Sequence, residues 1–299
     1  MSRKISLICF VLVFAVTLAQ AWDGPPTQPN LSASAIVERN VTARGGLQAW
    51  RSVQTLSLQG KLGAGGNQRA ALQPLTGKLD QKIVPSRPVD EAKLPFVMEL
   101  KRSRKMRLEL QFNGQTALQV YDGINGWKLR PYLNRRVVEP FTDEELKAAS
   151  LQADLDGPLV DYVAKGTRIE LAGVEKVDGR DTYKLTLTLK SGGVTHAWID
   201  AQTFLETKIE GQPRRMDGTY HPVEVYFRDY RTVDGLQIPY LLETKVLPVS
   251  KTVLRMKDTP VPTEQIIVEK IVVNPKLDDS HFSKPDAGVA ASSAKSKAS

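Results

Sequence analysis

Residues 94–112 read LPFVMELKRSRKMRLELQF, in which two runs of alternating apolar and polar residues flank the basic turn KRSRK at 101–105. The apolar members of these runs are Phe96, Met98 and Leu100 before the turn, and Met106, Leu108, Leu110 and Phe112 after it. Because side chains alternate across a strand, a period of two predicts one apolar face and one solvated face. The stretch therefore indicates an antiparallel β-hairpin within a one-sided sheet.

The same period of two recurs along most of the chain. Leu56, Leu58 and Leu62 share one face in QTLSLQGKL (54–62), ahead of the hairpin. Later strand-like runs are TRIELAGVEKV (167–177), DTYKLTLTLK (181–190), VTHAWID (194–200), FLETKIEG (204–211), PVEVYFRDYR (222–231), IPYLLETKVL (238–247) and EQIIVEKIVVN (264–274). Asp-Gly pairs at 178–179 and 234–235 are turn signals between such runs. Short strands joined in this way predict an antiparallel meander or barrel.

The stretch YDGINGWKLRP (121–131) contains a second hairpin signal. Glycine supplies the positive φ of a tight hairpin turn, so the Asp122-Gly123 pair predicts a corner between two strands. A phosphate-binding glycine loop would open onto a helix, whereas a strand follows here. Trp127 then shares a face with Leu129 and should match Leu118 and Val120 across the hairpin.

Two regions have helical patterns. SASAIVERNVTARGG (32–46) can be capped by Ser32 or Ser34 and stopped by its glycine pair. Thr142 and Glu145 form a T-x-x-E capping box at the start of a longer region, about 142–165. An apolar stripe follows that box, with a second helix expected from the glycine and proline at 157–158. The stripe consists of Leu146, Leu151, Leu155, Leu159 and Val163. A long polar loop, 63–94, separates the first two strands.

The amino-terminal residues have the three parts of a secretory signal peptide. Arg3 and Lys4 are followed by an apolar run at 5–18 and by an A-x-A cleavage motif at 19–21, and the run is too short for a membrane span. The sequence thus predicts an exported chain with a signal peptide at 1–21 and a linker at 22–31. A single domain at 32–283 and a disordered, low-complexity tail at 284–299 complete the predicted organisation.

Cysteine usage and charge limit the chemistry of the exported chain. Cys9 lies inside the signal and is the sole cysteine of the sequence, so the mature chain should have no disulfide, no thiol chemistry and no lipid anchor. Without Arg3 and Lys4 the mature chain has 39 basic against 33 acidic residues, a net charge of +6. That excess, on an exported chain, argues against nucleic acid and leaves transient contact with an anionic membrane surface open.

Catalytic and metal-binding patterns are not found in the sequence. His196, His221 and His281 are far apart, without the spacing of metal ligands. There is no G-x-S-x-G elbow and no P-loop. The carboxylates at 143–145 are explained by helix capping. We therefore expect no catalytic residues, no metal and no cofactor.

The order of elements resembles that of the periplasmic outer-membrane lipoprotein-sorting proteins, the LolA/LolB-like family, in a divergent subgroup. The shared features are an exported N-terminal helix, strands containing ELKRSRKMRLEL (99–110), the YDGINGW hairpin, a helical insertion, and a meander ending in LDDSHF (277–282). The resemblance implies a mainly β fold with α, an incomplete antiparallel barrel (half-barrel) covered by helices that act as a lid over an apolar cavity.

The resemblance also implies roles for individual residues. Arg102 matches the basic residue at the cavity mouth of the carrier, where it is implied to hold the lid closed through hydrogen bonds. Leu146, Leu151 and Leu155 would belong to the lid. The cavity lining would consist of Met98, Leu100, Leu108, Leu110, Phe112, Leu118, Val120 and Trp127. Patterning alone leaves an open cavity and a solid core as alternatives. The basic residues of 101–107 likewise fit either lipid headgroups or a solubilised sheet edge.

These expectations combine into a non-catalytic periplasmic carrier that holds a lipid, or the acyl chains of a lipoprotein, in a half-barrel. The alternative is an envelope regulatory or scaffold protein that binds a protein partner, such as an envelope membrane protein, on the same fold. A hydrolase with an unfamiliar site around His196 or His221 is a third hypothesis.

Overall fold

The computed structural model describes residues 31–64, 92–131, 135–216, 218–249 and 263–286. The chain from Ser32 onward forms one compact unit. The predicted signal peptide, nearly all of the linker, most of the 63–94 loop and the tail beyond residue 286 lie outside the described residues.

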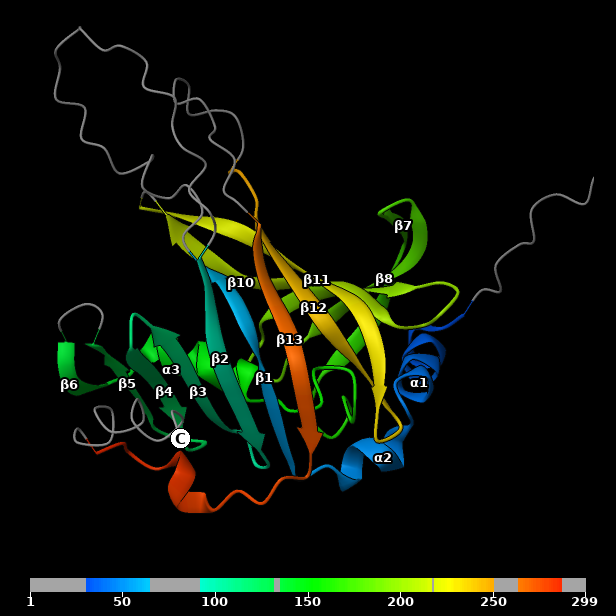
Figure 1. Cartoon of the computed structure of the whole chain (residues 1–299). Helices are drawn as coiled ribbons and strands as arrows, with labels where there is room; N and C mark the ends of the chain where they lie inside the picture. Colours follow the sequence, from blue (N-terminus) through cyan, green and yellow to red (C-terminus); the bar gives the residue numbers. More distant parts are fainter. Residues whose placement is uncertain (1–30, 65–91, 132–134, 217, 250–262, 287–299) are drawn as a thin grey trace, which may run out of the picture. The chain divides into compact units, whose positions relative to one another are not determined.

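A single antiparallel sheet of thirteen strands dominates the described chain (Figure 1). Its strands are β1 (Thr55–Ala64), β2 (Ala92–Lys101), β3 (Lys105–Phe112), β4 (Gln115–Tyr121), β5 (Gly126–Arg130), β6 (Arg135–Pro140), β7 (Arg168–Val177), β8 (Arg180–Thr188), β9 (Val194–Asp200), β10 (Glu206–Met216), β11 (Thr219–Val233), β12 (Leu236–Val246) and β13 (Glu264–Val273). The two predicted hairpins, β2–β3 and β4–β5, are both present, with turns at 102–104 and 122–125. The prediction of an antiparallel meander is confirmed.

Strand order follows the sequence except at one place. The order is β6-β5-β4-β3-β2-β1-β13-β12-β11-β10-β9-β8-β7, so β1 pairs with β13 and two meanders meet at that seam. Register shifts in the seam between Gln59 and Gly60, where a Cβ on Gly60 would lie 2.0 Å from the Ile267 carbonyl oxygen. Only glycine fits this close approach.

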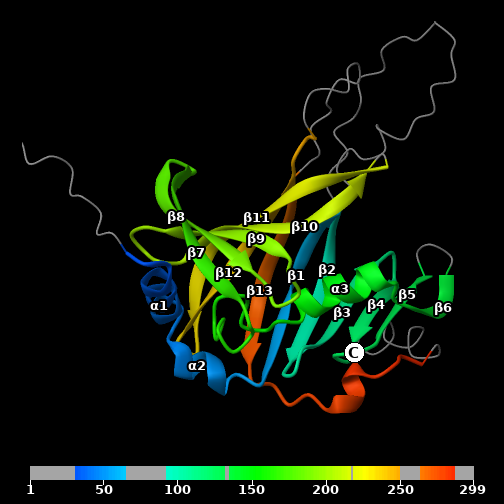
Figure 2. The same ribbon diagram turned by 180° about the vertical axis from the view of Figure 1, so that it is seen from behind.

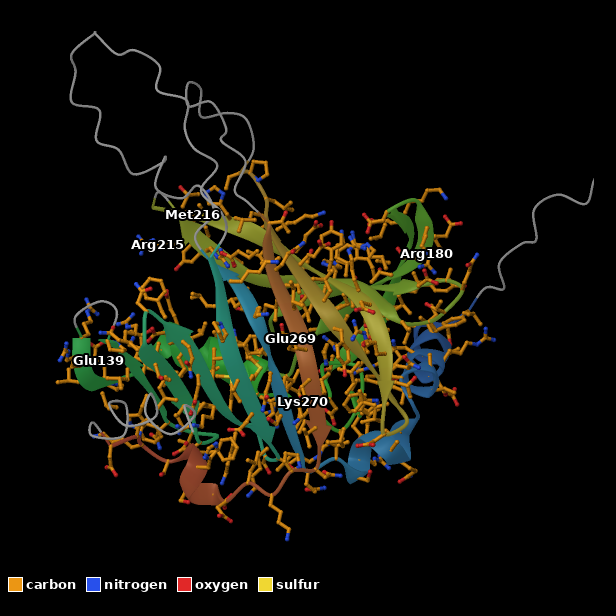
Figure 3. The ribbon with its side chains drawn as sticks, viewed as in Figure 1. Glu139, Arg180, Arg215, Met216, Glu269 and Lys270 are labelled. Atoms are coloured by element: carbon orange, nitrogen blue, oxygen red, sulfur yellow. The ribbon has the colours of Figure 1, made fainter. Side chains whose placement is uncertain are left out.

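Strands β6 and β7 are the two edges of the sheet, so the sheet is not closed into a barrel. Figure 3 shows Glu139 and Arg180 near these opposite ends of the sheet.

Two short helices precede the sheet. Helix α1 (Ala33–Ala43) begins where the sequence predicted, because the Ser32 hydroxyl accepts a hydrogen bond from the Ala35 amide. Helix α2 (Leu47–Ser52) follows directly and leads into β1. Ile36 and Val37 of α1 and Trp50 of α2 are buried, so both helices contribute to the core.

Helix α3 (Asp143–Gln152) has the capping box expected from the sequence. The Thr142 hydroxyl accepts from the Glu145 amide, and the Glu145 carboxylate accepts from the Thr142 amide. The prediction of a helical region up to about residue 165 is wrong beyond Gln152, because residues 154–166 form a series of turns. Positive φ values at Asp161 and Gly157 belong to these turns.

The position of α3 and these turns follows from the topology. Strand β6 ends at one edge of the sheet and β7 begins at the other, so the connection between them has to cross a face. We call α3 with the turns, residues 143–166, the inner cover, and the face that it crosses the inner face. Figure 2 shows α3 in front of β3–β5, whereas in Figure 1 it lies behind them.

The opposite, outer face of β3–β5 has a cover of its own. After β13 the chain continues as an irregular segment that contains the 3-10 helix η3 (Asp279–Phe282). We call residues 275–286 the C-terminal strap. Phe282 of the strap is fully buried against Leu118, Val120 and Leu129. The sheet is therefore covered on its two faces by two different segments.

Candidate functional site

The inner face is lined by apolar side chains that differ in exposure. Strand register places Leu56, Leu100 and Met106 in one row, and all three are buried. The next row, with Met98 and Leu108, is only half-buried. The inner face thus has a closed core at one end and half-buried apolar side chains farther along, among which Phe96, paired with Leu110, is buried.

This apolar surface continues across the seam between the two meanders. Leu58 pairs with Ile271 of β13, and Leu62 pairs with Ile266, which in turn pairs with Leu242 of β12. Of these side chains only Ile271 is buried, and the other four keep part of their surface accessible. Apolar side chains that stay partly accessible in an extended group are a candidate binding surface.

The register divides the eight predicted lining residues between two faces, so the prediction that they line one cavity is wrong. Five of them lie on the inner face: Met98, Leu100, Leu108, Leu110 and Phe112. Leu108 pairs with Gln119, and Leu118 pairs with Glu109. Leu118, Val120 and Trp127 therefore lie on the outer face, around Phe282 of the strap.

The error lies in the relative phase of neighbouring strands. Each strand was read correctly by itself, but a shift of one residue moves all its side chains to the other face. Strand β4 did contain a warning, because Ala117, Leu118, Val120 and Tyr121 are apolar on both faces and all four are buried. An apolar run of this kind indicates a strand that is covered on both sides.

Arg102, in the turn after β2, connects the sheet to the inner cover. Its Nε donates to the Val53 carbonyl at 2.7 Å. Its Nη2 donates to the Trp50 carbonyl at 2.7 Å and to the Asp156 carboxylate at 2.8 Å. One of these bonds joins Arg102 to the inner cover; the role of Arg102 in holding a lid closed, implied by the resemblance, stays a prediction.

Asp156 is the most buried carboxylate of this arrangement, with a side chain that is 1% exposed. Lys165 donates to it at 2.5 Å and also to Asp154 at 2.8 Å. Arg104 approaches Asp154 at 3.8 Å from the β2–β3 turn. We call Arg102, Asp154, Asp156 and Lys165 the latch, because they join the inner cover to the sheet.

The two latch carboxylates differ in their pKa values. Burial would raise the pKa of Asp156, but hydrogen bonds and positive charge from Lys165 and Arg102 outweigh this and hold that pKa below its ordinary value. Burial raises the pKa of Asp154, and the neighbouring Lys165 offsets this only in part. Asp156 is thus the carboxylate that is held ionised.

Arg44, which sequence reasoning missed, fixes the cover from a second side. Its Nη1 donates to the Asp156 carbonyl at 3.0 Å and to Glu206 at 3.2 Å, and its guanidinium lies over the Trp50 ring. Arg44 is buried at the end of α1. No spacing motif marks Arg44, because its hydrogen-bond partners Asp156 and Glu206 come from segments more than a hundred residues away.

The helical part of the inner cover is held more loosely. Lys128 of β5 donates to Glu145, and hydrogen bonds from Lys128 and the Thr142 amide hold the pKa of Glu145 below its ordinary value although burial acts in the opposite direction. Tyr220, at the start of β11, donates to Glu144 at 2.9 Å in an exposed contact. Helix α3 thus contacts both meanders.

The predicted lid residues occupy different environments. Leu155 is buried, Leu146 is half-buried, and Leu151 is exposed. The expected apolar stripe therefore breaks, because a spacing of four keeps residues on one face only within a helix, and α3 ends at Gln152. Val163, the last member of that stripe, is 72% exposed.

The basic turn is paired with acidic residues on both sides of the sheet. Lys101 and Lys105 contact Asp279 of the strap at 2.8 and 3.1 Å. Arg102 and Arg104 contact the inner cover instead. The turn thus joins both covers, a role that the two interpretations from sequence, lipid headgroups or a solubilised edge, did not include.

The histidines have separate surroundings. His196 contacts Glu210, His221 contacts the Leu247 carbonyl oxygen, and His281 contacts Glu99. Within the described ranges there is no group of three or more His, Asp or Glu residues that could hold a metal ion. Among the helices that the structure describes, none has the length and apolar character needed to cross a bilayer.

Comparison with known proteins places the fold. Neither protein-family models nor curated proteins match the chain. A solved putative outer membrane lipoprotein-sorting protein domain from Vibrio parahaemolyticus is similar at 13% identity and a TM-score of 0.50, covering 84% of this chain and 96% of its own. A DUF1329 family protein from Desulfovibrio piger is similar at 16% identity and a TM-score of 0.50, covering 84% and 97%.

A LolA superfamily protein from Nitrosomonas europaea also aligns, at 14% identity and a TM-score of 0.49, over 85% of this chain and 98% of its own. This chain has an open, LolA-like half-barrel fold. The fold class predicted from the sequence is confirmed, and the resemblance to the lipoprotein-sorting proteins holds at the level of the fold.

Proposed function

We propose that this protein is a non-catalytic carrier that binds the acyl chains of a lipid or lipoprotein on the inner face of its half-barrel. The observation that carries the proposal is the row of half-buried apolar side chains on that face, with Leu58, Met98, Leu108 and Leu110 as its centre. Met98 suits such a surface because an unbranched thioether adapts to ligands of irregular shape.

The energetics of such binding are favourable. Each methylene that leaves water gains about 0.8 kcal/mol, so a long acyl chain gains on the order of 10 kcal/mol before the cost of ordering it. A strip that runs from β3 across the seam to β12 offers a continuous apolar surface for this purpose. The fold likeness to a lipoprotein-sorting domain supports the same class of ligand.

Release would require movement of the inner cover. The latch at Arg102 and Asp156 fixes the turns of the cover, and α3 meets the second meander through the exposed Tyr220–Glu144 contact. The looser end is therefore α3, which would move while the latched turns stay in place. A signal-like amino terminus supports the periplasm as the compartment in which the carrier acts.

The proposal is tested on protein exported with its own signal and purified from the periplasm. Organic extraction and native mass spectrometry should find a co-purifying lipid, and the delipidated protein should take up a fluorescent fatty acid. Leu110→Glu places a charge on the inner face and should abolish uptake. Gln111→Glu adds the same charge to the exposed outer face one residue later and should leave uptake unchanged. Absence of lipid and of uptake in the parent chain would overturn the proposal.

A further inference from the structure

The C-terminal strap binds the outer face with the features of a bound peptide. Phe282 fills a socket formed by Leu118, Val120 and Leu129, with Trp127 packed at its side. The strap forms one 3-10 turn and pairs with no strand of the described sheet. An aromatic anchor in an apolar socket is the usual centre of a peptide interface.

Charged contacts fix the part of the strap that precedes this anchor. Asp279, three residues before Phe282, contacts Lys101 and Lys105 of the basic turn. Lys101 also donates to the Leu277 carbonyl at 2.6 Å. Arg107 donates to the His281 carbonyl at 3.2 Å. The outer face thus contacts the Asp279 carboxylate, the Phe282 ring, two backbone carbonyls and, through Glu99, the His281 ring.

The strap does not fill the surface that it covers. A cavity of about 570 Å³ remains between the strap and the outer face, next to the Phe282 socket. The sheet lines it with both apolar and polar side chains, which are Leu118, Leu129, Thr116, Arg107 and Glu109. A recognition surface that extends beyond its present occupant can accept a segment longer or bulkier than the strap.

We propose that the outer face of β3–β5 is a recognition site for an acidic–aromatic segment of a partner protein, and that the strap occupies it as an intramolecular mimic. The partner segment has a carboxylate three residues before a phenylalanine, because this spacing places one group at Lys101 and Lys105 and the other in the socket. The basic turn supplies the charge complementarity. The site lies on the face opposite to the proposed lipid surface and does not depend on lipid binding.

The strap competes with any such segment. An intramolecular occupant has a high effective concentration, so the strap is released in only a small fraction of molecules. The apparent affinity for a partner is the intrinsic affinity multiplied by that fraction. Weakening the strap should therefore strengthen the binding of such a segment in trans.

The test uses a fluorescent peptide with the sequence of residues 276–286, KLDDSHFSKPD, titrated against the full chain. Binding to Phe282→Ala should be at least about tenfold tighter than to the parent chain. A peptide with alanine in place of its phenylalanine, and one with lysines in place of its aspartates, should bind at least about tenfold more weakly. Equal binding of all three peptides would overturn the proposal, as would a lack of binding to every strap variant.

Near-ultraviolet circular dichroism shows whether Phe282→Ala folds. If it does not, further variants still test the proposal. Asp279→Lys keeps the aromatic anchor, weakens the strap by charge repulsion, and should also increase peptide affinity. Lys105→Ala, combined with Asp279→Lys, removes one of the two lysines that recognise the acidic residue and should reduce that gain. Lys61→Ala, at an exposed lysine of β1, combined with Asp279→Lys, is the matched control and should retain it.

Discussion

The inner cover and the C-terminal strap are both fixed to the same basic turn, but by different physics. The inner cover is held by an ionic latch whose central carboxylate, Asp156, has only 1% of its side chain exposed. The strap is held by the apolar anchor Phe282, and its carboxylate, Asp279, is 69% exposed. One cover thus depends on a buried charge and the other on a buried ring.

This difference shows why the number of ion pairs says little about how strongly a segment is attached to the sheet. A buried pair loses its solvation, so removing one partner leaves the other charged and unpaired inside the protein. An exposed pair remains hydrated and is screened by salt, so its removal changes little. The two covers allow both cases to be measured in one chain.

The largest effect is expected from Asp156→Ala. This substitution leaves Lys165 without its closest carboxylate and should lower the free energy of unfolding by about 3 kcal/mol. Urea denaturation followed by tryptophan fluorescence measures it. Arg51→Ala removes an exposed pair with Asp161 of the same turns and serves as the control, with a much smaller shift of the urea midpoint. Equal shifts would show that burial does not distinguish the two pairs.

Phe282→Ala should come next, with a local effect. Loss of a fully buried phenylalanine costs about 3 kcal/mol of strap attachment, which corresponds to roughly hundredfold faster amide exchange in the strap. Hydrogen exchange with mass spectrometry should show this change in the strap peptides, while the seam peptides keep their protection. Ser280→Ala, on the exposed side of the same turn, is the control. Faster exchange throughout the sheet would contradict separate attachment of the strap.

The pH dependence of unfolding should separate the two latch carboxylates. The folded-state pKa of Asp156 is lowered, so its stabilisation is complete above the ordinary aspartate value and is lost as the pH falls through the folded value. The folded-state pKa of Asp154 is raised, so its contribution has the opposite sign and is lost as the pH rises.

Urea midpoints measured between pH 3 and 7 check this sign. Asp156→Asn should reduce the loss of stability at the acid end of the profile. Asp154→Asn should steepen that loss and should cost less than Asp156→Asn at pH 7. Identical profiles for the two variants would indicate that the carboxylates share one environment.

The smallest effect is expected from Asp279→Ala. Its pairs with Lys101 and Lys105 are exposed, so amide exchange in the strap should rise by no more than about fivefold. The increase should shrink further in 1 M salt, where exposed charges are screened within about 3 Å. An effect as large as that of Phe282→Ala would mean that charge, and not the aromatic ring, holds the strap.

The sequence predicted the fold well because period-two patterning and Asp-Gly turns are local signals. It also singled out Arg102 through the resemblance; Arg102 does bond to the inner cover, while its gating role stays a prediction. It failed for Leu118, Val120 and Trp127, since the relative phase of β3 and β4 is set by pairing and not by either strand alone. Strand β4 has buried apolar residues on both faces, so it has no polar side to fix that phase.

The contacts of the latch could not be predicted from the sequence, for a related reason. Arg102 and Asp156 come from a turn and from a non-helical part of a region predicted as helix, and Arg44 meets them from α1. Their meeting depends on how the connection between β6 and β7 crosses the inner face. From the sequence, residues 277–282 were predicted only as the end of the meander. No local pattern marks Phe282 as a residue that anchors the strap.

The seam between β1 and β13 has a consequence for the order of assembly. All other neighbours in the described sheet are consecutive in sequence, whereas Leu56 pairs with Val273, more than two hundred residues later. Closing so long a loop costs more entropy than any hairpin in the chain, and non-local pairing slows folding. During synthesis β1 leaves the ribosome first and cannot pair with β13 until β13, the last strand, has been made. The hydrogen-bonding edge of β1 that later meets β13 is therefore unpaired for most of that time, and an unpaired strand edge is open to pairing with other chains.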